Sequence, residues 1–490
     1  MSGDEKGSHS DPKNPARRTF MRSMGTAAAA CAASALGIRC GKEEGWDARR
    51  EPDRRDVSVE GYFRSRFGLG LDNVYWGDLH THSLYSFDAP IWCRGPSLPE
   101  DSCRFARDPE GGNLDFLSLT DHAEIPPARF LPSEDVDLWQ SLLRISREFN
   151  NEDPAVGKPL IIFPGWEYTN THMLRPWIGT DAGYGHKCVI FKDLVKVPPT
   201  RLTTSFPGSG SEVVARDAAA LWEGLADFRP PSPGSEGSAL TIPHTPSMNG
   251  ELPSGDHRTD WNYMDEDFVR NVEICSKHGN AEGPPPIEIT CGPEESLIDY
   301  IPDRNDETIT LRRLLYQRWV RDGNGLFRIS FVGGTDNHMG QPGNDVVRQC
   351  DPTGGVLPFR GTLTGIAAPT LTRDALWSGL WHRHTLATTT GPKRTPVLMA
   401  VETAGKSVLM GENGKHDRAV RLRVLAPSDV ERIEVVVDGC LLFTVSGGIL
   451  DEELALDEGR HYLYVRAART EHEDPPSMSW SSPVYLEDQA

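Results

Sequence analysis

Several features that would assign the chain to a simple functional class are scarce or absent. Its 490 residues carry 51 basic side chains against 71 acidic ones, a formal net charge of −20, so the positive excess that attracts nucleic acid or an anionic membrane is missing. No apolar run is long enough for a transmembrane helix. The GxSxG pattern of serine hydrolases does not occur, and the nine cysteines show no paired zinc-finger spacing. These absences argue against a nucleic-acid partner, a membrane-spanning protein and a serine or thiol nucleophile.

What is present is the composition of a globular protein with a large core. Apolar residues make up 38% of the chain and charged residues 25%, which is ordinary for a soluble protein. A chain of this length is expected to form two or three domains.

The N-terminus has the order of regions found in an export signal. Arg17 and Arg18 are adjacent, and the stretch MGTAAAACAASALGI that follows them is small and only mildly apolar. This order resembles a twin-arginine signal, so we expect residues 1–45 to be an export signal and linker, and the protein to be periplasmic or otherwise extracytoplasmic. Lipid attachment at Cys31 or Cys40 is the expected route to a membrane, if there is one. The alternative interpretation is an alanine-rich surface helix behind a basic tail.

Short β-type runs recur between residues 72 and 335, with helical patterns between several of them. The β-type runs are residues 73–80, 114–122, 159–167, 186–191, 238–244, 269–275 and 327–336. The helical patterns cover residues 136–150, 212–228 and 307–322. Strands that alternate with helices are typical of a parallel sheet. We therefore predict an α/β fold in which residues 46–395 form a distorted seven-stranded (β/α) barrel with long insertions.

The pattern changes after residue 396, where apolar and polar residues alternate in closely spaced runs without helices. Such a pattern predicts an antiparallel β-sandwich over residues 396–490. This second domain carries no obvious chemistry and is expected either to support the barrel or to shape the site from one side.

Imidazole and carboxylate side chains sit at or near the ends of the β-type runs. They are His80, His82 and Asp88 in GDLHTHSLYSFDA, Asp121 and His122 in LTDH, Glu167 in PGWE, His186 in GHKCVIF, His244 in IPHTP, Glu273 in VRNVEIC, and Asp336 and His338 in GGTDNH. Strand ends of an α/β barrel converge on one mouth. Any one of these motifs alone is as readily a structural histidine, but together they predict a metal site, and donors without thiolate suit Zn, Mn or Fe.

These ordered motifs resemble the PHP superfamily, named for polymerase and histidinol phosphatase. Within it the chain is most similar to an exported branch labelled only as a domain of unknown function, akin to the carbaryl-hydrolase-type metallohydrolases. The resemblance implies two or three divalent metal ions. The implied ligands are His80, His82, Glu167 and Asp336 for one ion, Glu167, His186 and His244 for a second, and Asp88, His122 and His338 for a third. Glu167 would bridge two ions, and Glu273 lies outside the pattern, so we expect it to support ligands.

The predicted activity is hydrolysis of a small-molecule phosphoester, carbamate, ester or amide by a metal-activated water. Glu167, Asp336 and His338 are the predicted catalytic residues among the ligands. Arg383, together with His384 in WHRHTLATTTG, is a further candidate that would neutralise an anionic group, and packing at a helix end is its equally simple alternative. The rival hypothesis is a non-catalytic, metal-bearing binding protein of the cell envelope.

Overall fold

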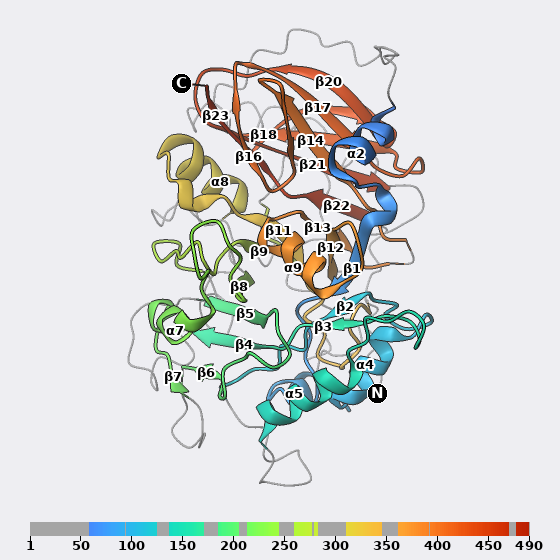
Figure 1. Cartoon of the computed structure of the whole chain (residues 1–490), viewed down its shortest axis with the longest axis vertical. Helices are drawn as coiled ribbons and strands as arrows, with labels where there is room; N and C mark the ends of the chain where they lie inside the picture. Colours follow the sequence, from blue (N-terminus) through green and yellow to red (C-terminus); the bar gives the residue numbers. More distant parts are fainter. Residues whose placement is uncertain are drawn as a thin grey trace, which may run out of the picture. The chain divides into compact units, whose positions relative to one another are not determined.

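The computed structural model of the chain has alternating strands and helices up to about residue 390 and strands alone after it (Figure 1). The structure describes residues 58–93, 95–124, 137–170, 185–204, 213–244, 259–276, 279–282, 310–344, 361–391, 393–469 and 477–489. The predicted export signal, with Arg17, Arg18, Cys31 and Cys40, lies outside the described residues.

The first three predicted strands form a parallel ladder. Strand β1 (Val74–Asp78) pairs in parallel with β2 (Phe116–Leu117), and β2 pairs in parallel with β3 (Ile161–Ile162). Gly77 lets β1 and β2 approach each other, because a Cβ at this position would lie 2.1 Å from the Phe116 ring. The carboxyl ends of these strands therefore share one edge of the sheet, as predicted.

The next strands depart from the prediction. Strands β4 (Gly165–Asn170), β5 (Gly185–Phe191) and β8 (Ala239–His244) form an antiparallel ladder, whereas β9 (Asn271–Ser276) and β11 (Ser330–Gly333) pair in parallel. The fold is thus α/β with mixed sheets, and no continuous ladder closes into a barrel within the described ranges. The prediction of uniformly parallel strands was wrong for β5, because alternation of apolar residues indicates a strand but not its direction.

Single bridges join neighbouring ladders at the ends that carry the metal-type residues. Thr81, after β1, bridges to Asn337, after β11, and His122, after β2, bridges to Glu167 in β4. Each bridge links two of the predicted ligand motifs. The ladders are therefore held together at the edge where the candidate site lies.

Helices flank these ladders, and several of them are capped by side chains that the sequence supplies. They include α2 (Val59–Phe67), α3 (Ala89–Trp92), α4 (Pro99–Arg107), α5 (Leu138–Phe149), α7 (Ala218–Gly224), α8 (Leu311–Leu315) with a π-helical continuation (Tyr316–Arg321), and α9 (Arg373–Trp381). Asp137 accepts a hydrogen bond from Gln140 N at the start of α5, and Thr372 does the same for Ala375 N at α9. Among the described helices, none combines the length and hydropathy needed to cross a membrane.

The region after residue 396 is antiparallel for the most part, and its sheets are connected to the first half of the chain. One sheet contains β15 (Lys406–Leu409), β14 (Leu398–Thr403), β17 (Ala419–Leu425) and β20 (Ile449–Ala455). The remaining strands are β16 (Asn413–His416), β18 (Arg432–Val437), β19 (Cys440–Ser446), β21 (His461–Arg469), β22 (Ser477–Ser481) and β23 (Val484–Asp488). Strand β22 pairs with β13 (Thr385–Thr389), β13 with β12 (Thr362–Ala367), and β12 with β1. Hydrogen bonding therefore runs without a break across the predicted domain boundary.

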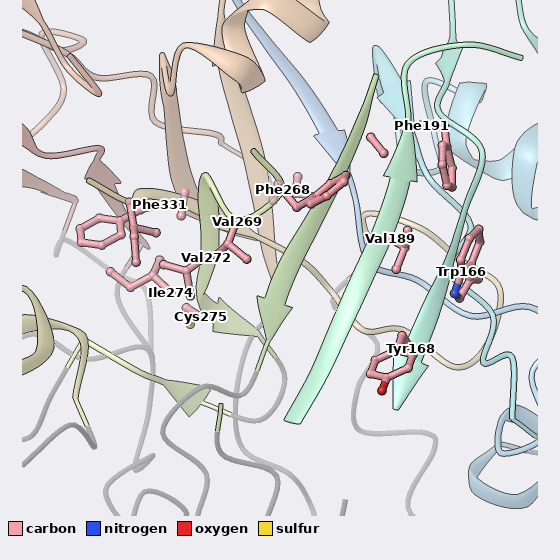
Figure 2. Close-up of a cluster of buried hydrophobic side chains, with 14 of the residues drawn as sticks. Trp166, Tyr168, Val189, Phe191, Phe268, Val269, Val272, Ile274, Cys275 and Phe331 are labelled. Atoms are coloured by element: carbon pink, nitrogen blue, oxygen red, sulfur yellow. The ribbon is translucent and has the colours of Figure 1, made fainter. Parts of the chain in front are cut away.

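Two apolar layers cover opposite faces of the same strands. Figure 2 shows the outer layer, where Trp166 and Tyr168 of β4 and Val189 and Phe191 of β5 pack on one side. The inner layer contains alternate residues, among them Cys188 and Ile190 of β5 and Leu240 and Ile242 of β8. Because side chains alternate along a strand, Glu167 faces inward between Trp166 and Tyr168. The inner face is apolar at one end and carries the candidate site at the other.

Candidate metal centre

The nine predicted metal ligands are all buried and meet in one cluster, which we call the ligand cluster. Its members are His80, His82, Asp88, His122, Glu167, His186, His244, Asp336 and His338, and none is more than 8% exposed. They come from the loop after β1, the loop after β2, strands β4, β5 and β8, and the loop after β11. Segments far apart in the sequence thus supply one site.

The reversed direction of β5 is what brings its histidine into the cluster. His186 is near the beginning of β5 and His244 ends β8, and the antiparallel register places them directly opposite each other. His244 follows Leu240 and Ile242 on the inner face of β8. A histidine that opens its strand therefore reaches the same edge as one that ends its strand.

The first group is formed by His80, His82, Glu167 and Asp336. His82 Nε2 lies 2.9 Å from Asp336 Oδ1 and 3.2 Å from Glu167 Oε2. His80 Nε2 lies 3.2 Å from Glu167 Oε2 and 3.4 Å from Asp336 Oδ1. Despite these short distances, His82 Nε2 makes no hydrogen bond within the described part of the chain. Converging donor atoms, one of which has no hydrogen-bond partner, fit a divalent cation held between them.

Glu167 faces two groups at once through its two carboxylate oxygens. Oε2 faces His80 and His82, as above, while Oε1 contacts His186 Nδ1 and lies 2.8 Å from His244 Nε2. The second predicted group therefore also converges. A carboxylate with one oxygen directed to each group is the arrangement expected of a ligand shared by two ions.

The third group is formed by Asp88, His122 and His338. Asp88 Oδ2 lies 2.7 Å from His338 Nε2 and 3.3 Å from His122 Nε2. His122 Nε2 is also 3.5 Å from Glu167 Oε2, so the third group adjoins the first two. The donor set of imidazoles and carboxylates fits Zn, Mn or Fe at each group.

Four of the histidines have their remaining ring nitrogen held by a neighbour. Nδ1 of His80 lies 2.9 Å from Glu273 Oε2, and Nδ1 of His338 lies 2.9 Å from the Asp336 carbonyl oxygen. The other two pairs are His82 Nδ1 with Ser86 Oγ at 3.1 Å and His122 Nδ1 with Thr169 Oγ1 at 2.8 Å. Such partners fix the tautomer and orientation of metal-binding imidazoles.

Only some of these supporting residues could be predicted from the sequence. Glu273 was expected to support ligands, and its contact with His80 fits that role. Ser86 and Thr169 were missed, because a hydroxyl near a ligand motif has no distinctive spacing. Ser86 Oγ also donates to Asp88 Oδ1 at 2.6 Å, so one hydroxyl links two of the groups.

Two further buried aspartates hold the loops that carry the ligands. Asp78 accepts hydrogen bonds from Thr335 Oγ1 at 2.5 Å and from the backbone N–H groups of His80 and Gly343 at 3.2 and 3.0 Å. Asp121 accepts from Ser83 N at 2.5 Å and Ser83 Oγ at 2.8 Å. Asp78 thus ties the loop after β1 to the loop after β11, and Asp121 faces Ser83 instead of the ligand cluster.

Charges of both signs coexist in the cluster before a metal binds. Burial alone would raise the pKa of Glu167, but the charges of His122, His244 and His186 outweigh it and hold that pKa well below its usual range. Burial would lower the pKa of His122, yet the charges of Glu167 and Asp88 raise it well above the usual value. Burial is the main cause of the lowered pKa of His244. Metal binding must therefore displace protons from some imidazoles and not from others.

The structure does not bring Arg383 to the cluster. Arg383 follows α9, and the charged side chains that act on it most strongly are Arg270 and Arg328. Both neighbours precede the parallel strands β9 and β11, whereas Asp336 follows β11. His384 lies beside Arg383 and its Nε2 is 3.2 Å from Glu412 Oε1. These residues lie at the other end of the strands from the ligands.

The fold and the ligand cluster together define an α/β protein with buried imidazole and carboxylate groups that could hold metal ions. Residues 70–129 match the model of a protein family of unknown function, DUF3604, and this segment contains His80, His82, Asp88 and His122. The match confirms the predicted resemblance to a family of unknown function for these residues. No curated protein sequence matches the chain.

One solved structure is similar to the chain over most of its length. It is a two-domain protein from Bacteroides vulgatus containing a predicted PHP-like metal-dependent phosphoesterase, with 13% sequence identity and a TM-score of 0.39. The similarity covers 89% of this chain and 99% of that one.

Proposed function

We propose that the protein is a metal-dependent hydrolase that acts on a small molecule. The observation that carries the proposal is the convergence of nine buried imidazole and carboxylate side chains into three adjoining groups. Eight of the nine, all but His338, also belong to overlapping triads whose donor atoms lie within 4.8 Å of one another, and Glu273 completes one of these triads. If the cluster had only a structural role, buried donor atoms such as His82 Nε2 would remain without a hydrogen bond, which is rare in folded proteins. Divalent ions would supply Lewis acidity and activate a water at neutral pH.

The chain's own residues set the geometry for this chemistry. Glu273 and Ser86 orient His80 and His82, so that both Nε2 atoms face Glu167. Asp336 holds a backbone φ of 50°, in the left-handed region that aspartate tolerates better than most residues. A strained ligand supported from both sides is typical of a preorganised site. Glu167, Asp336 and His338 therefore remain the proposed catalytic ligands.

The substrate is proposed to reach the ligand cluster from its more accessible side. His186 and Asp88 are 8% and 7% exposed, whereas His82 and His80 are 0% and 1% exposed. A substrate oxygen would thus meet the second and third groups first. Phosphoester, carbamate, ester and amide bonds all present an oxygen that a cation polarises, and these are the proposed substrate classes.

Export is part of the same proposal. The twin-arginine pattern at Arg17 and Arg18 is the first support. The second is Cys93, which is disulfide-bonded, since disulfides persist mainly in oxidising compartments. An exported enzyme with this signal would acquire its metal before it crosses the membrane.

A hydrolysis panel tests the activity. Full-length protein should cleave at least one member of a panel of matched phosphate, carbamate and carboxylate esters and amides. Chelation should abolish turnover, and added Zn, Mn or Fe should restore it, while serine- and thiol-directed reagents should have little effect. Asp336→Ala should remove nearly all turnover, and Asp417→Ala, at an exposed position in the C-terminal region, should not. Full turnover after chelation would overturn the proposal, and metal binding without turnover on any class would favour the binding-protein hypothesis.

A further inference from the structure

Arg383 is a buried cation that lacks a partner among the described residues. It is 8% exposed, and its guanidinium makes no hydrogen bond and no ion pair within the described part of the chain; Nε is buried and unsatisfied. Arg383 also holds a φ of 68° at the end of α9, where glycine is the usual residue. The chain therefore keeps a charged side chain at a position that is unfavourable for both its backbone and its charge.

Two more arginines surround the same place. Arg270 donates from Nε to the Trp381 carbonyl oxygen at 2.7 Å, and its guanidinium lies 4.2 Å from the centroid of the Trp381 ring. Arg328 donates from Nη1 to Asn413 Oδ1 at 3.0 Å. Asn413 is two residues from Gly411, whose missing side chain makes room for the Arg383 backbone, since a Cβ there would lie 2.0 Å from Arg383 O. The three side chains thus come from the starts of β9 and β11 and the end of α9.

Negative charge at this place is scarce. Glu266 is the one acid that forms an ion pair with any of the three arginines among the described residues, at 3.7 Å from Arg328 Nη2, and its side chain is 48% exposed. Asp267 and Glu236 influence Arg270 from further away, but Asp267 pairs with Arg229 at 2.8 Å and Glu236 lies between Lys192 and His382. Three guanidinium groups therefore share one partly exposed carboxylate.

The electrostatics agree with the geometry. Burial, and then the charges of Arg270 and Arg328, lower the pKa of Arg383 to about 9. Because a guanidinium does not lose its proton in a protein, this shift expresses the cost of holding three cations together. An uncompensated buried charge is strongly destabilising, and a bound anion removes that cost.

We propose that Arg270, Arg328 and Arg383 bind a small oxyanion of the phosphate or sulfate class. A guanidinium presents a fork of N–H groups that suits two oxygens of such an anion, and the bonds are strengthened by charge on both partners. The site lies at the opposite end of β9 and β11 from the ligand cluster, so it is a second site and does not depend on the proposed hydrolase activity.

The test is thermal unfolding of the full chain with phosphate, sulfate, acetate or chloride at constant ionic strength. Phosphate and sulfate should raise the Tm of the unchanged protein by a few degrees relative to chloride, because a ligand that binds only the folded state stabilises it. Acetate with a comparable effect would overturn the assignment to the phosphate or sulfate class. Arg383→Met keeps the strained backbone and removes the charge. In chloride its Tm should equal or exceed that of the unchanged protein, and it should lose most of the response to phosphate.

Phosphate bound at the ligand cluster would persist in Arg383→Met, so the difference between the two proteins reports on the arginine site. Calorimetric titration should show one phosphate fewer bound in the variant. If Arg383→Met does not fold, Arg328→Gln decides, with an expected loss of at least tenfold in phosphate affinity, and Arg418→Gln, whose arginine is exposed, serves as the matched control. Equal phosphate responses in all variants would overturn the proposal, as would a Tm of Arg383→Met several degrees lower in chloride.

Discussion

The two ends of strands β9 and β11 concentrate charge in opposite ways. At one end, the ligand cluster sets six imidazoles around three carboxylates, with contacts such as His338 Nε2 to Asp88 Oδ2 at 2.7 Å. At the other end, Arg270, Arg328 and Arg383 share the single nearby carboxylate of Glu266 among the described residues. The first end offers lone pairs and suits cations, whereas the second offers N–H donors and suits anions.

The contrast shows how one set of strands separates a cation-binding end from an anion-binding end. The inner face of the sheets between them is apolar, with Cys188, Ile190, Leu240, Ile242 and Val332 in one buried layer. Among the described residues, no hydrogen bond or ion pair links Arg270, Arg328 or Arg383 to a member of the ligand cluster. Substitutions at one end should therefore leave the other end unchanged, and the predictions below test that independence.

The largest effect is expected from Glu167→Gln. Its two oxygens contact both the His80–His82 pair and the His186–His244 pair, so loss of its charge weakens two groups together. Metal affinity should fall by more than the roughly 10–100-fold that loss of a supporting partner causes. Elemental analysis should show a larger metal loss than in His122→Ala, and Glu266→Gln should retain the full complement. Equal losses in Glu167→Gln and His122→Ala would reject the bridging role.

Glu273→Gln should have the next largest effect. Its carboxylate accepts the Nδ1 proton of His80 at 2.9 Å, and an amide there no longer favours the required tautomer as strongly. We expect roughly 10–100-fold weaker metal binding, measured by competition with a chelator of known affinity. Unchanged metal affinity would show that Glu273 has only a packing role. Loss of one full metal equivalent in Glu273→Gln would show that Glu273 is itself a ligand.

Proton release on metal binding should depend on pH. The charges of Glu167 and Asp88 raise the pKa of His122 well above its usual value against the opposing effect of burial, so the metal-free protein keeps that proton to a higher pH than an ordinary histidine does. A raised pKa means that the proton is present below it and is lost as pH rises through it, so metal affinity should increase with pH over that range. Calorimetry in buffers of different ionisation enthalpy should detect this release. Release that is zero or independent of pH would contradict the assigned charge states.

Asp78→Asn should have the smallest effect. The introduced amide would keep one acceptor oxygen but turn an N–H₂ group either toward Thr335 Oγ1 and Gly343 N, which now donate to one carboxylate oxygen, or toward the N–H groups of His80 and Thr335, which donate to the other. The loops that carry His80 and Asp336 should loosen, with a loss of several-fold in metal affinity and little change in far-ultraviolet circular dichroism. Thr335→Ser keeps the hydroxyl and should behave like the unchanged protein. A loss as large as that of Glu167→Gln would mean that Asp78 is itself a ligand.

The sequence predicts the strands well and shows the motifs of the ligand cluster, because both follow local rules. Each of the seven β-type runs contains a strand, since apolar residues with turn residues at both ends are sufficient to indicate one. The ligands are recognisable because His80, His82, Asp336 and His338 stand in short motifs at strand ends. Their convergence is a consequence of topology and was expected from the shared edge of an α/β sheet.

Other features depend on information that no local pattern contains. The direction of β5 is set by its pairing with β4 and β8, and alternation is the same for either direction. Asp78 and Asp121 stand beside ligands and are of the same residue type, so only the structure shows that they accept hydrogen bonds from loops. Arg383 was a candidate to neutralise an anionic group near the mouth, with packing at a helix end as the alternative, and the sequence does not reveal which edge of the sheet a helix end reaches.

The metal content of the full-length protein tests the central claim most directly. Protein purified after expression in metal-replete medium should contain two or three equivalents of Zn, Mn or Fe, and Glu167→Gln prepared in parallel should contain at least one equivalent fewer. Less than one equivalent in the unchanged protein would contradict the claim that these nine side chains form a metal centre.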